Sequence, residues 1–89
     1  MSYKVRIAEK LEKTLARIGK KDRERIFDRI SLLESDPRPK ESKKLKGQNK
    51  ATIYRIRSGN YRILYTIEDE ILLVLVVDID HRKNIYRDY

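Results

Sequence analysis

The sequence predicts an α+β fold in which an N-terminal strand and a helical hairpin precede a three-stranded antiparallel meander, in the order βααβββ. Three observations predict this fold. The chain begins with a short alternating run, two segments follow with apolar residues at helical spacing, and a Gly-Asn pair later separates two further alternating runs. We expect one mainly antiparallel sheet, and the 89 residues suit a single domain over residues 1–89.

The first strand is expected at residues 3–7, because Tyr3, Val5 and Ile7 alternate with two basic residues. The first helix should follow directly. Its apolar residues recur at helical spacing (Leu11, Leu15 and Ile18), and Gly19 is a typical helix stop.

A second helix is expected after Asp22, which can cap its N-terminus. Its apolar stripe comprises Ile26, Ile30 and Leu33, and is widened by Phe27. The helix must end near residues 36–39, since two prolines cannot continue it. The two helices each need cover for one face, so we expect both on the same side of the sheet.

Residues 40–51 form a polar, lysine-rich stretch that we interpret as a connector. Glu68, Asp69 and Glu70 indicate a turn, and residues 71–79 indicate a strand that is apolar on both faces and interior in its sheet.

The Gly59-Asn60 pair predicts a two-residue hairpin loop. In that register Arg57 faces Arg62 and Arg55 faces Leu64, so the three arginines share one sheet face. Tyr54, Ile56, Ile63 and Tyr65 share the other face, where the helices should lie. A three-residue loop would bury arginine beside isoleucine. We therefore expect an uncovered, solvent-facing arginine face suited to an anion.

The charge distribution also points to this region. The net charge is +8, and residues 38–62 hold nine Lys or Arg against one acid, while the remainder is balanced. A concentrated basic patch attracts polyanions such as nucleic acid, although many charge runs are only a solvated surface. The connector supplies four candidate RNA-binding lysines: Lys43, Lys44, Lys46 and Lys50.

Three residues near the C-terminus could add chemistry. His81 is the only histidine and is a candidate proton acceptor, although a lone histidine is often incidental. Arg82 would have to fold back to join Arg57 and Arg62. Tyr86 could stack on an unpaired base or could simply anchor the C-terminus.

Other classes of site find no support in the sequence. The chain has no cysteine, no Gly-rich phosphate loop and no metal-ligand cluster, so we expect no disulfide, no metal and no cofactor. No signal peptide is recognised, and the longest apolar run has seven residues, from 71 to 77. We expect a cytoplasmic protein without a membrane partner.

In order and spacing, these motifs resemble the RelE/ParE superfamily of toxins from toxin–antitoxin systems, most closely the RelE branch. The similarity includes the helical hairpin ending in Asp36-Pro37, residues 45–47, the strand 54–57, the segment 59–65 and the closing segment 81–87. It spans nearly the whole chain and implies a RelE-like, microbial-RNase-like domain.

The resemblance implies a ribosome-dependent endoribonuclease that cleaves mRNA in the A site of the 30S subunit and so inhibits translation. The RNA 2′-hydroxyl would attack its own adjacent phosphate and leave a 2′,3′-cyclic phosphate. Position by position, it makes Arg62 a phosphate-stabilising arginine, Arg82 a second catalytic arginine and Tyr86 the tyrosine that stacks on a codon base. Arg55 and Arg57 match lysines of relatives. Since arginine does not lose its proton, the best remaining proton acceptor would be His81.

The resemblance also implies a partner, a co-encoded antitoxin that is acidic, folds on binding and forms a hetero-oligomer with the toxin. Two alternatives stay open. One is a ParE-like inhibitor of DNA gyrase, and the other is a non-enzymatic basic module that binds nucleic acid as a co-repressor.

Overall fold

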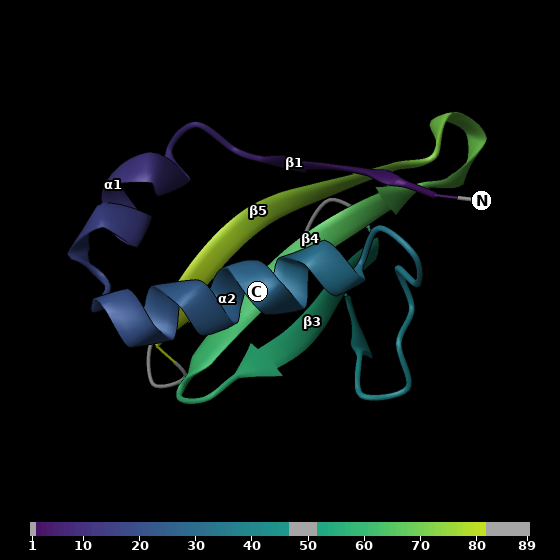
Figure 1. Cartoon of the computed structure of the whole chain (residues 1–89). Coiled ribbons are helices and arrows are strands. Elements are labelled where there is room, and N and C mark those ends of the chain that lie inside the picture. Colours follow the sequence, from purple (N-terminus) through teal and green to yellow (C-terminus); the bar gives the residue numbers. More distant parts are fainter. Residues whose placement is uncertain (1, 47–51, 82–89) are drawn as a thin grey trace.

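The computed structural model describes residues 2–46 and 52–81, in which five strands form one sheet of order β1-β5-β4-β3-β2 (Figure 1). β1 is parallel to β5, and the other neighbouring strands are antiparallel. The elements along the chain are β1 (Lys4–Ile7), α1 (Leu11–Arg17), α2 (Lys20–Leu32), β2 (Lys43–Lys46), β3 (Thr52–Ser58), β4 (Tyr61–Glu68), the 3-10 turn η1 (Asp69–Ile71) and β5 (Leu73–His81).

The predicted α+β architecture is confirmed, and the sheet gains one edge strand. β2 lies inside the stretch that the sequence indicated as a connector, and it pairs with residues 52–55 of β3. Its residues are Lys-Lys-Leu-Lys, with a single apolar side chain. Alternation over so short and basic a run is too weak to predict a strand. The ladder of hydrogen bonds offered by β3 selects the extended conformation instead.

The connection between the two helices is shorter than expected. α2 begins at Lys20 with Gly19 as its N-cap, so the prediction that Asp22 caps this helix is wrong. Asp22 lies in the first turn instead, where a carboxylate still interacts favourably with the positive end of the helix dipole. Gly19 and Ile18 thus make up the whole connection between the two helices.

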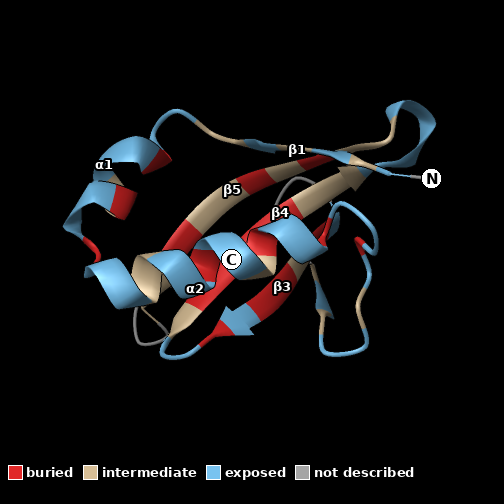
Figure 2. Ribbon diagram, viewed as in Figure 1, coloured by how far each residue is buried: buried red, intermediate tan, exposed pale blue. Residues whose placement is uncertain are grey.

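Both helices cover the same face of the sheet, α1 over β5 and α2 over β3 (Figure 1). Their predicted apolar residues are buried against the strands in one core with Ile56, Ile63 and Tyr65. Figure 2 shows this buried band along the strands beneath the helices. Phe27 is the exception. It is 41% exposed, so it does not widen the apolar stripe as expected.

A register shift in β5 changes which of its side chains face this core. Leu64 pairs with Asp78 and Tyr65 pairs with Val76, which leaves Val77 as the extra residue of a β-bulge. Because of the bulge, Val76 and Ile79 both face the helices. Asp78 is turned to the other face of the sheet.

A polar network holds the segment after α2 against the strands. Asp69 accepts two hydrogen bonds from the Arg38 guanidinium, at 3.1 and 2.7 Å, and one from the Tyr3 hydroxyl at 2.7 Å. Arg38 also stacks over the Tyr54 ring, 5.4 Å from its centroid. Beneath them, the buried Tyr65 hydroxyl donates to the Pro37 carbonyl at 2.8 Å. The chain between α2 and β2 is therefore fixed at several points.

Candidate nucleic-acid interface

The predicted hairpin register is confirmed at every position of the β3–β4 ladder. Arg57 lies opposite Arg62 and Arg55 opposite Leu64, with Gly59 at a φ of +59° in the two-residue loop. A positive φ is easily adopted by glycine, which explains its place in this turn. Three arginines of two adjacent strands therefore share the sheet face that lies away from the helices.

The expectation that this face is solvent-exposed is wrong for two of the three arginines. Arg55 is 6% exposed and Arg62 is 9% exposed, whereas Arg57 is exposed. Arg55 lies between β2 and β4, and Arg62 lies between β3 and β5, so side chains from both neighbouring strands flank these two arginines, whereas β2 ends before Arg57. The same face also carries a second apolar cluster, formed by Ile53 and Leu64 and flanked by Leu45 and Val77. Burial of this kind fixes the position of a guanidinium far better than a solvated surface does.

Two aspartates lie alongside the arginines, and the sequence analysis did not find them. Asp80 is directly opposite Arg62, and Asp78 is opposite Leu64. Their carboxylates accept hydrogen bonds from the backbone N–H groups of His81 and Ile79, at 2.7 and 2.9 Å. An alternating pattern could have indicated their face only if the bulge at Val77 had been known.

The candidate lysines divide between the two faces. Lys43 pairs with Arg55 and so extends the arginine row to the edge strand, where it is exposed. Lys44 pairs with Tyr54 and belongs to the other face. Lys46 pairs with Thr52 through its backbone. Lys50 lies outside the described residues, as do Arg82 and Tyr86.

His81 lies on the opposite face from the arginines. It ends β5 across from Tyr61, and the two rings meet edge to face with centroids 5.7 Å apart. Together with Arg17 and other residues, His81 and Tyr61 line a pocket of about 330 Å³ at this end of the sheet. The structure therefore does not bring His81 together with Arg55, Arg57 and Arg62.

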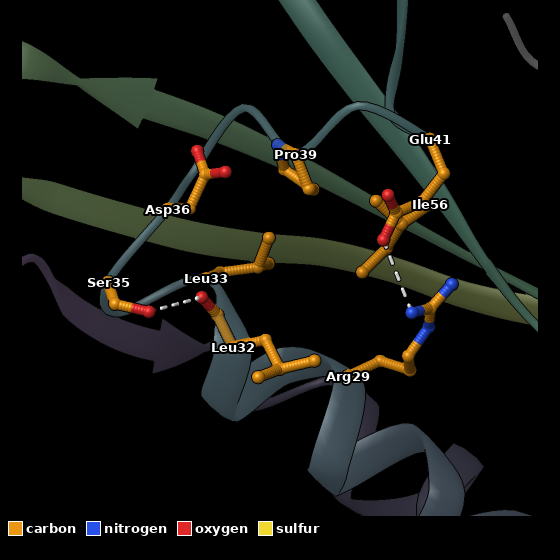
Figure 3. A pocket seen from close by; sticks show the side chains of 8 residues that line it. All are labelled: Arg29, Leu32, Leu33, Ser35, Asp36, Pro39, Glu41 and Ile56. Atoms are coloured by element: carbon orange, nitrogen blue, oxygen red, sulfur yellow. Dashed lines mark hydrogen bonds and ion pairs between the residues drawn. The ribbon is translucent and has the colours of Figure 1, made fainter.

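An arginine that the sequence analysis missed lies beside Arg57. The Arg29 Nε donates to the Arg57 carbonyl at 3.0 Å, and its guanidinium pairs with Glu41 at 3.3 Å. Figure 3 shows Arg29 reaching from α2 toward Glu41, at the rim of a pocket of about 200 Å³ lined by Leu32, Pro39 and other residues. Arg29 stands among charged residues on an amphipathic helix, so no sequence pattern singled it out.

Two further observations concern the part of the chain that the structure describes. Within residues 2–46 and 52–81, no group of three or more His, Asp or Glu side chains could hold a metal ion. Among the same residues, neither helix is long and apolar enough to cross a membrane.

Among the residues that the structure describes, a helical hairpin thus covers one face of a five-stranded sheet, and three arginines are aligned on the other face. Residues 3–86 match the family described as the ParE toxin of the type II toxin–antitoxin system parDE, and the chain belongs to this family.

Two toxins are similar to this chain, one along nearly its whole length and one over part of it. The putative toxin RelE1 of Methanocaldococcus jannaschii is 26% identical over 91 residues, which cover 99% of each protein. Toxin RelG of Mycobacterium tuberculosis is 46% identical over 37 residues, 42% of each protein. The predicted membership of the superfamily is thus confirmed, and the chain is a toxin of a type II toxin–antitoxin system of the RelE type.

Solved structures agree. The archaeal RelE–RelB complex from Pyrococcus horikoshii OT3 superimposes with a TM-score of 0.82 at 28% identity, covering 94% of this chain and 99% of that one. The toxin–antitoxin complex RelBE2 of Mycobacterium tuberculosis gives a TM-score of 0.80 at 25% identity, covering 92% of this chain and 100% of that one.

Proposed function

We propose that this toxin is a ribosome-dependent endoribonuclease that cleaves mRNA in the ribosomal A site and so inhibits translation. The observation that carries the proposal is the β3–β4 register, which aligns Arg55, Arg57 and Arg62 on one sheet face. Alternate residues of a strand lie about 6.6 Å apart, a spacing close to the phosphate repeat of an extended nucleic acid strand.

The chemistry requires little of the protein beyond positioning and charge. The RNA 2′-hydroxyl oxygen forms a bond to its own adjacent phosphorus, and the bond from phosphorus to the 5′-oxygen breaks. A 2′,3′-cyclic phosphate results. The proton lost by the 2′-hydroxyl is balanced by the proton gained by the leaving 5′-oxygen. Negative charge grows on the phosphoryl oxygens in the transition state, and fixed guanidinium groups stabilise it.

The burial of Arg55 and Arg62 supports a positioning role, since buried side chains need no reorganisation when the substrate binds. Arg57, which is exposed, would be the first of the three to meet a phosphate. Arg82 and Tyr86 would complete the site as a second catalytic arginine and a base-stacking tyrosine. We assign no proton acceptor, because arginine stays protonated and His81 faces the other side of the sheet.

A cognate antitoxin is the expected partner. The similar structures from Pyrococcus horikoshii and Mycobacterium tuberculosis are toxin–antitoxin complexes, which supports a hetero-oligomer here as well. An acidic segment that folds on binding would complement the net charge of +8. We place this segment over the arginine face, where it would compete with RNA.

The test is to add the purified protein to a cell-free translation reaction and to map mRNA ends by primer extension. Cuts at in-frame codons that need the ribosome are the expected result. Arg57→Ala should abolish most cuts, whereas Arg6→Ala should preserve them, since Arg6 is an exposed arginine on the far edge strand β1. Intact message in the presence of the wild-type protein would contradict the proposal.

A second candidate follows from the matched family, whose description is the ParE toxin of parDE. It is inhibition of DNA gyrase without RNA cleavage. Intact message accompanied by accumulating gyrase–DNA breaks would favour this candidate instead.

A further inference from the structure

The outer edge of β3 has one neighbour near its start and a different neighbour near its end. β2 pairs with β3 from Thr52 to Arg55, among the residues that the structure describes. In a two-residue hairpin the closing pair, here Ser58 and Tyr61, is hydrogen-bonded, so the N–H and C=O of Arg57 point away from β4. Arg29 of α2 occupies this edge, where its Nε donates to the Arg57 carbonyl at 3.0 Å. A helix side chain thus continues the sheet edge where β2 ends.

A pocket of about 330 Å³ opens beside this contact. It is lined by Arg25, Asp28 and Arg29 of α2 and by Arg57, Ser58 and Gly59 at the end of β3. Arg25 and Arg29 are four residues apart and so lie on one face of the helix. Three arginines and Asp28 line the pocket, and Glu41 pairs with Arg29, so the local net charge is about +1. The pocket therefore has the charge of an anion site.

One of the three arginines is already held in place. Arg29 is bonded to the Arg57 carbonyl on one side and to Glu41 on the other, and its side chain is 34% exposed. A fixed guanidinium loses less conformational entropy when it binds a ligand than a freely rotating one does. Arg25 and Arg57 are exposed, so both are accessible to an anion in the pocket.

We propose that this pocket is a second phosphate-binding site, which takes a backbone phosphate of single-stranded RNA next to the one held by the arginine face. The inference rests on the proposed function, because it extends the same RNA path. Arg57 links the two places, since it belongs to the arginine row of β3 and also lines the pocket. That continuity favours an RNA strand, which crosses from the sheet face around the β3 edge to α2, over a separate acidic peptide.

The test is a titration of the full-length protein with a short, 2′-O-methylated single-stranded RNA, which cannot be cleaved. Affinity is measured by fluorescence anisotropy at several salt concentrations. Arg25→Gln should weaken binding and reduce the magnitude of the slope of log K against log salt by about 0.7, the value for one phosphate contact of a single strand. Asp28→Asn should tighten binding, because Asp28 is the one carboxylate among the described residues that line the pocket.

The matched control is Lys13→Gln. Lys13 is exposed on α1 and lines none of the pockets described above, yet its substitution removes the same charge. Equal losses for Arg25→Gln and Lys13→Gln would overturn the proposal, because they would indicate only a general effect of net charge. Circular dichroism checks that all variants retain the fold.

NMR chemical shifts of backbone amides and of arginine Nε–H groups locate the ligand directly. RNA should shift the amides of Ser58 and Gly59 and the Arg25 and Arg29 Nε–H signals. Shifts at these signals with poly-glutamate but not with RNA would overturn the proposal in favour of an acidic protein partner. Failure here leaves mRNA cleavage in the translation assay unaffected. Conversely, RNA binding in this pocket without cleavage of any message would contradict the proposed function but not the proposed phosphate site.

Discussion

Arg62 on β4 lies directly opposite Asp80 on β5, on the sheet face that points away from the helices. This pairing depends on the bulge at Val77. Side chains alternate along a regular strand, so without the bulge Asp80 would face the core together with Val74 and Val76. One extra residue in β5 thus gives the arginine face its acidic neighbours and keeps two carboxylates out of the core.

Burial of Arg62 predicts that Arg62→Ala affects both stability and cleavage. Removing a buried charged side chain leaves neighbouring polar groups without their partner, which should cost about 1–3 kcal/mol of unfolding free energy. Arg57→Ala, at the exposed position directly opposite, should change stability by less than about 0.5 kcal/mol while cleavage falls. Urea unfolding and primer extension measure the two effects. Equal stability of the two variants would contradict the burial of Arg62.

A substitution at Leu64 tests whether the arginine face is shielded from water. Its side chain is fully buried, and it packs with Ile53 away from the helices. We expect Leu64→Ala to destabilise the protein by about 2–5 kcal/mol, as for a core leucine. Leu32→Ala is the matched control, because Leu32 is 57% exposed and should cost little. A small loss for Leu64→Ala would mean that this face is open to water.

The Arg38–Asp69 pair predicts a dependence of stability on acid. Hydrogen bonds from Arg38 and from the Tyr3 hydroxyl lower the pKa of Asp69 from 3.8 to about 2. A carboxyl whose pKa is lower in the folded state stabilises the fold above its unfolded pKa. That contribution is lost as pH falls through the folded value. Asp69→Asn should therefore be less stable than wild type at pH 5, and the difference should shrink between about pH 4 and pH 2.

Urea unfolding of both proteins across this range gives the measurement. Glu70→Gln, a change at an exposed acid in the same turn, should not reproduce the effect. A difference that stays constant down to pH 2 would contradict the role of Asp69. The pair is partly exposed, so high salt should weaken its contribution.

Tyr65 anchors the segment after α2 through a buried hydrogen bond to the Pro37 carbonyl. Burial raises the pKa of its hydroxyl to about 12, because the phenolate would be poorly solvated there. Tyr65→Phe keeps the ring but removes the bond, and we expect a loss of about 1 kcal/mol in unfolding free energy.

Amide hydrogen exchange provides a second measurement of the effect of this substitution. In Tyr65→Phe, the segment from Asp36 to Ser42 should exchange faster than in wild type, while the β3–β4 hairpin should not change. If the exchange rates of the two regions changed equally, the bond would not be what anchors this segment.

The sequence alone determined the fold class, the helical hairpin and the full register of the β3–β4 ladder. These features rest on local signals. Apolar residues recur at helical spacing in both helices, and a Gly-Asn loop between two alternating runs allows one register that keeps arginine out of the core. Because the register fixes the sheet face of each side chain, the shared face of Arg55, Arg57 and Arg62 could be predicted as well.

Only the tertiary structure decided the surroundings of those arginines. β2 forms because β3 offers it a partner, and the bulge at Val77, set in the pairing of β5 with β4, decides the face of Asp78 and Asp80. Arg29 reaches the Arg57 carbonyl only after α2 has packed on the sheet. Periodicity reports which way a side chain points along its own element. What covers the side chain depends on neighbouring elements, which is why Arg55 and Arg62 are buried where the sequence predicted exposure.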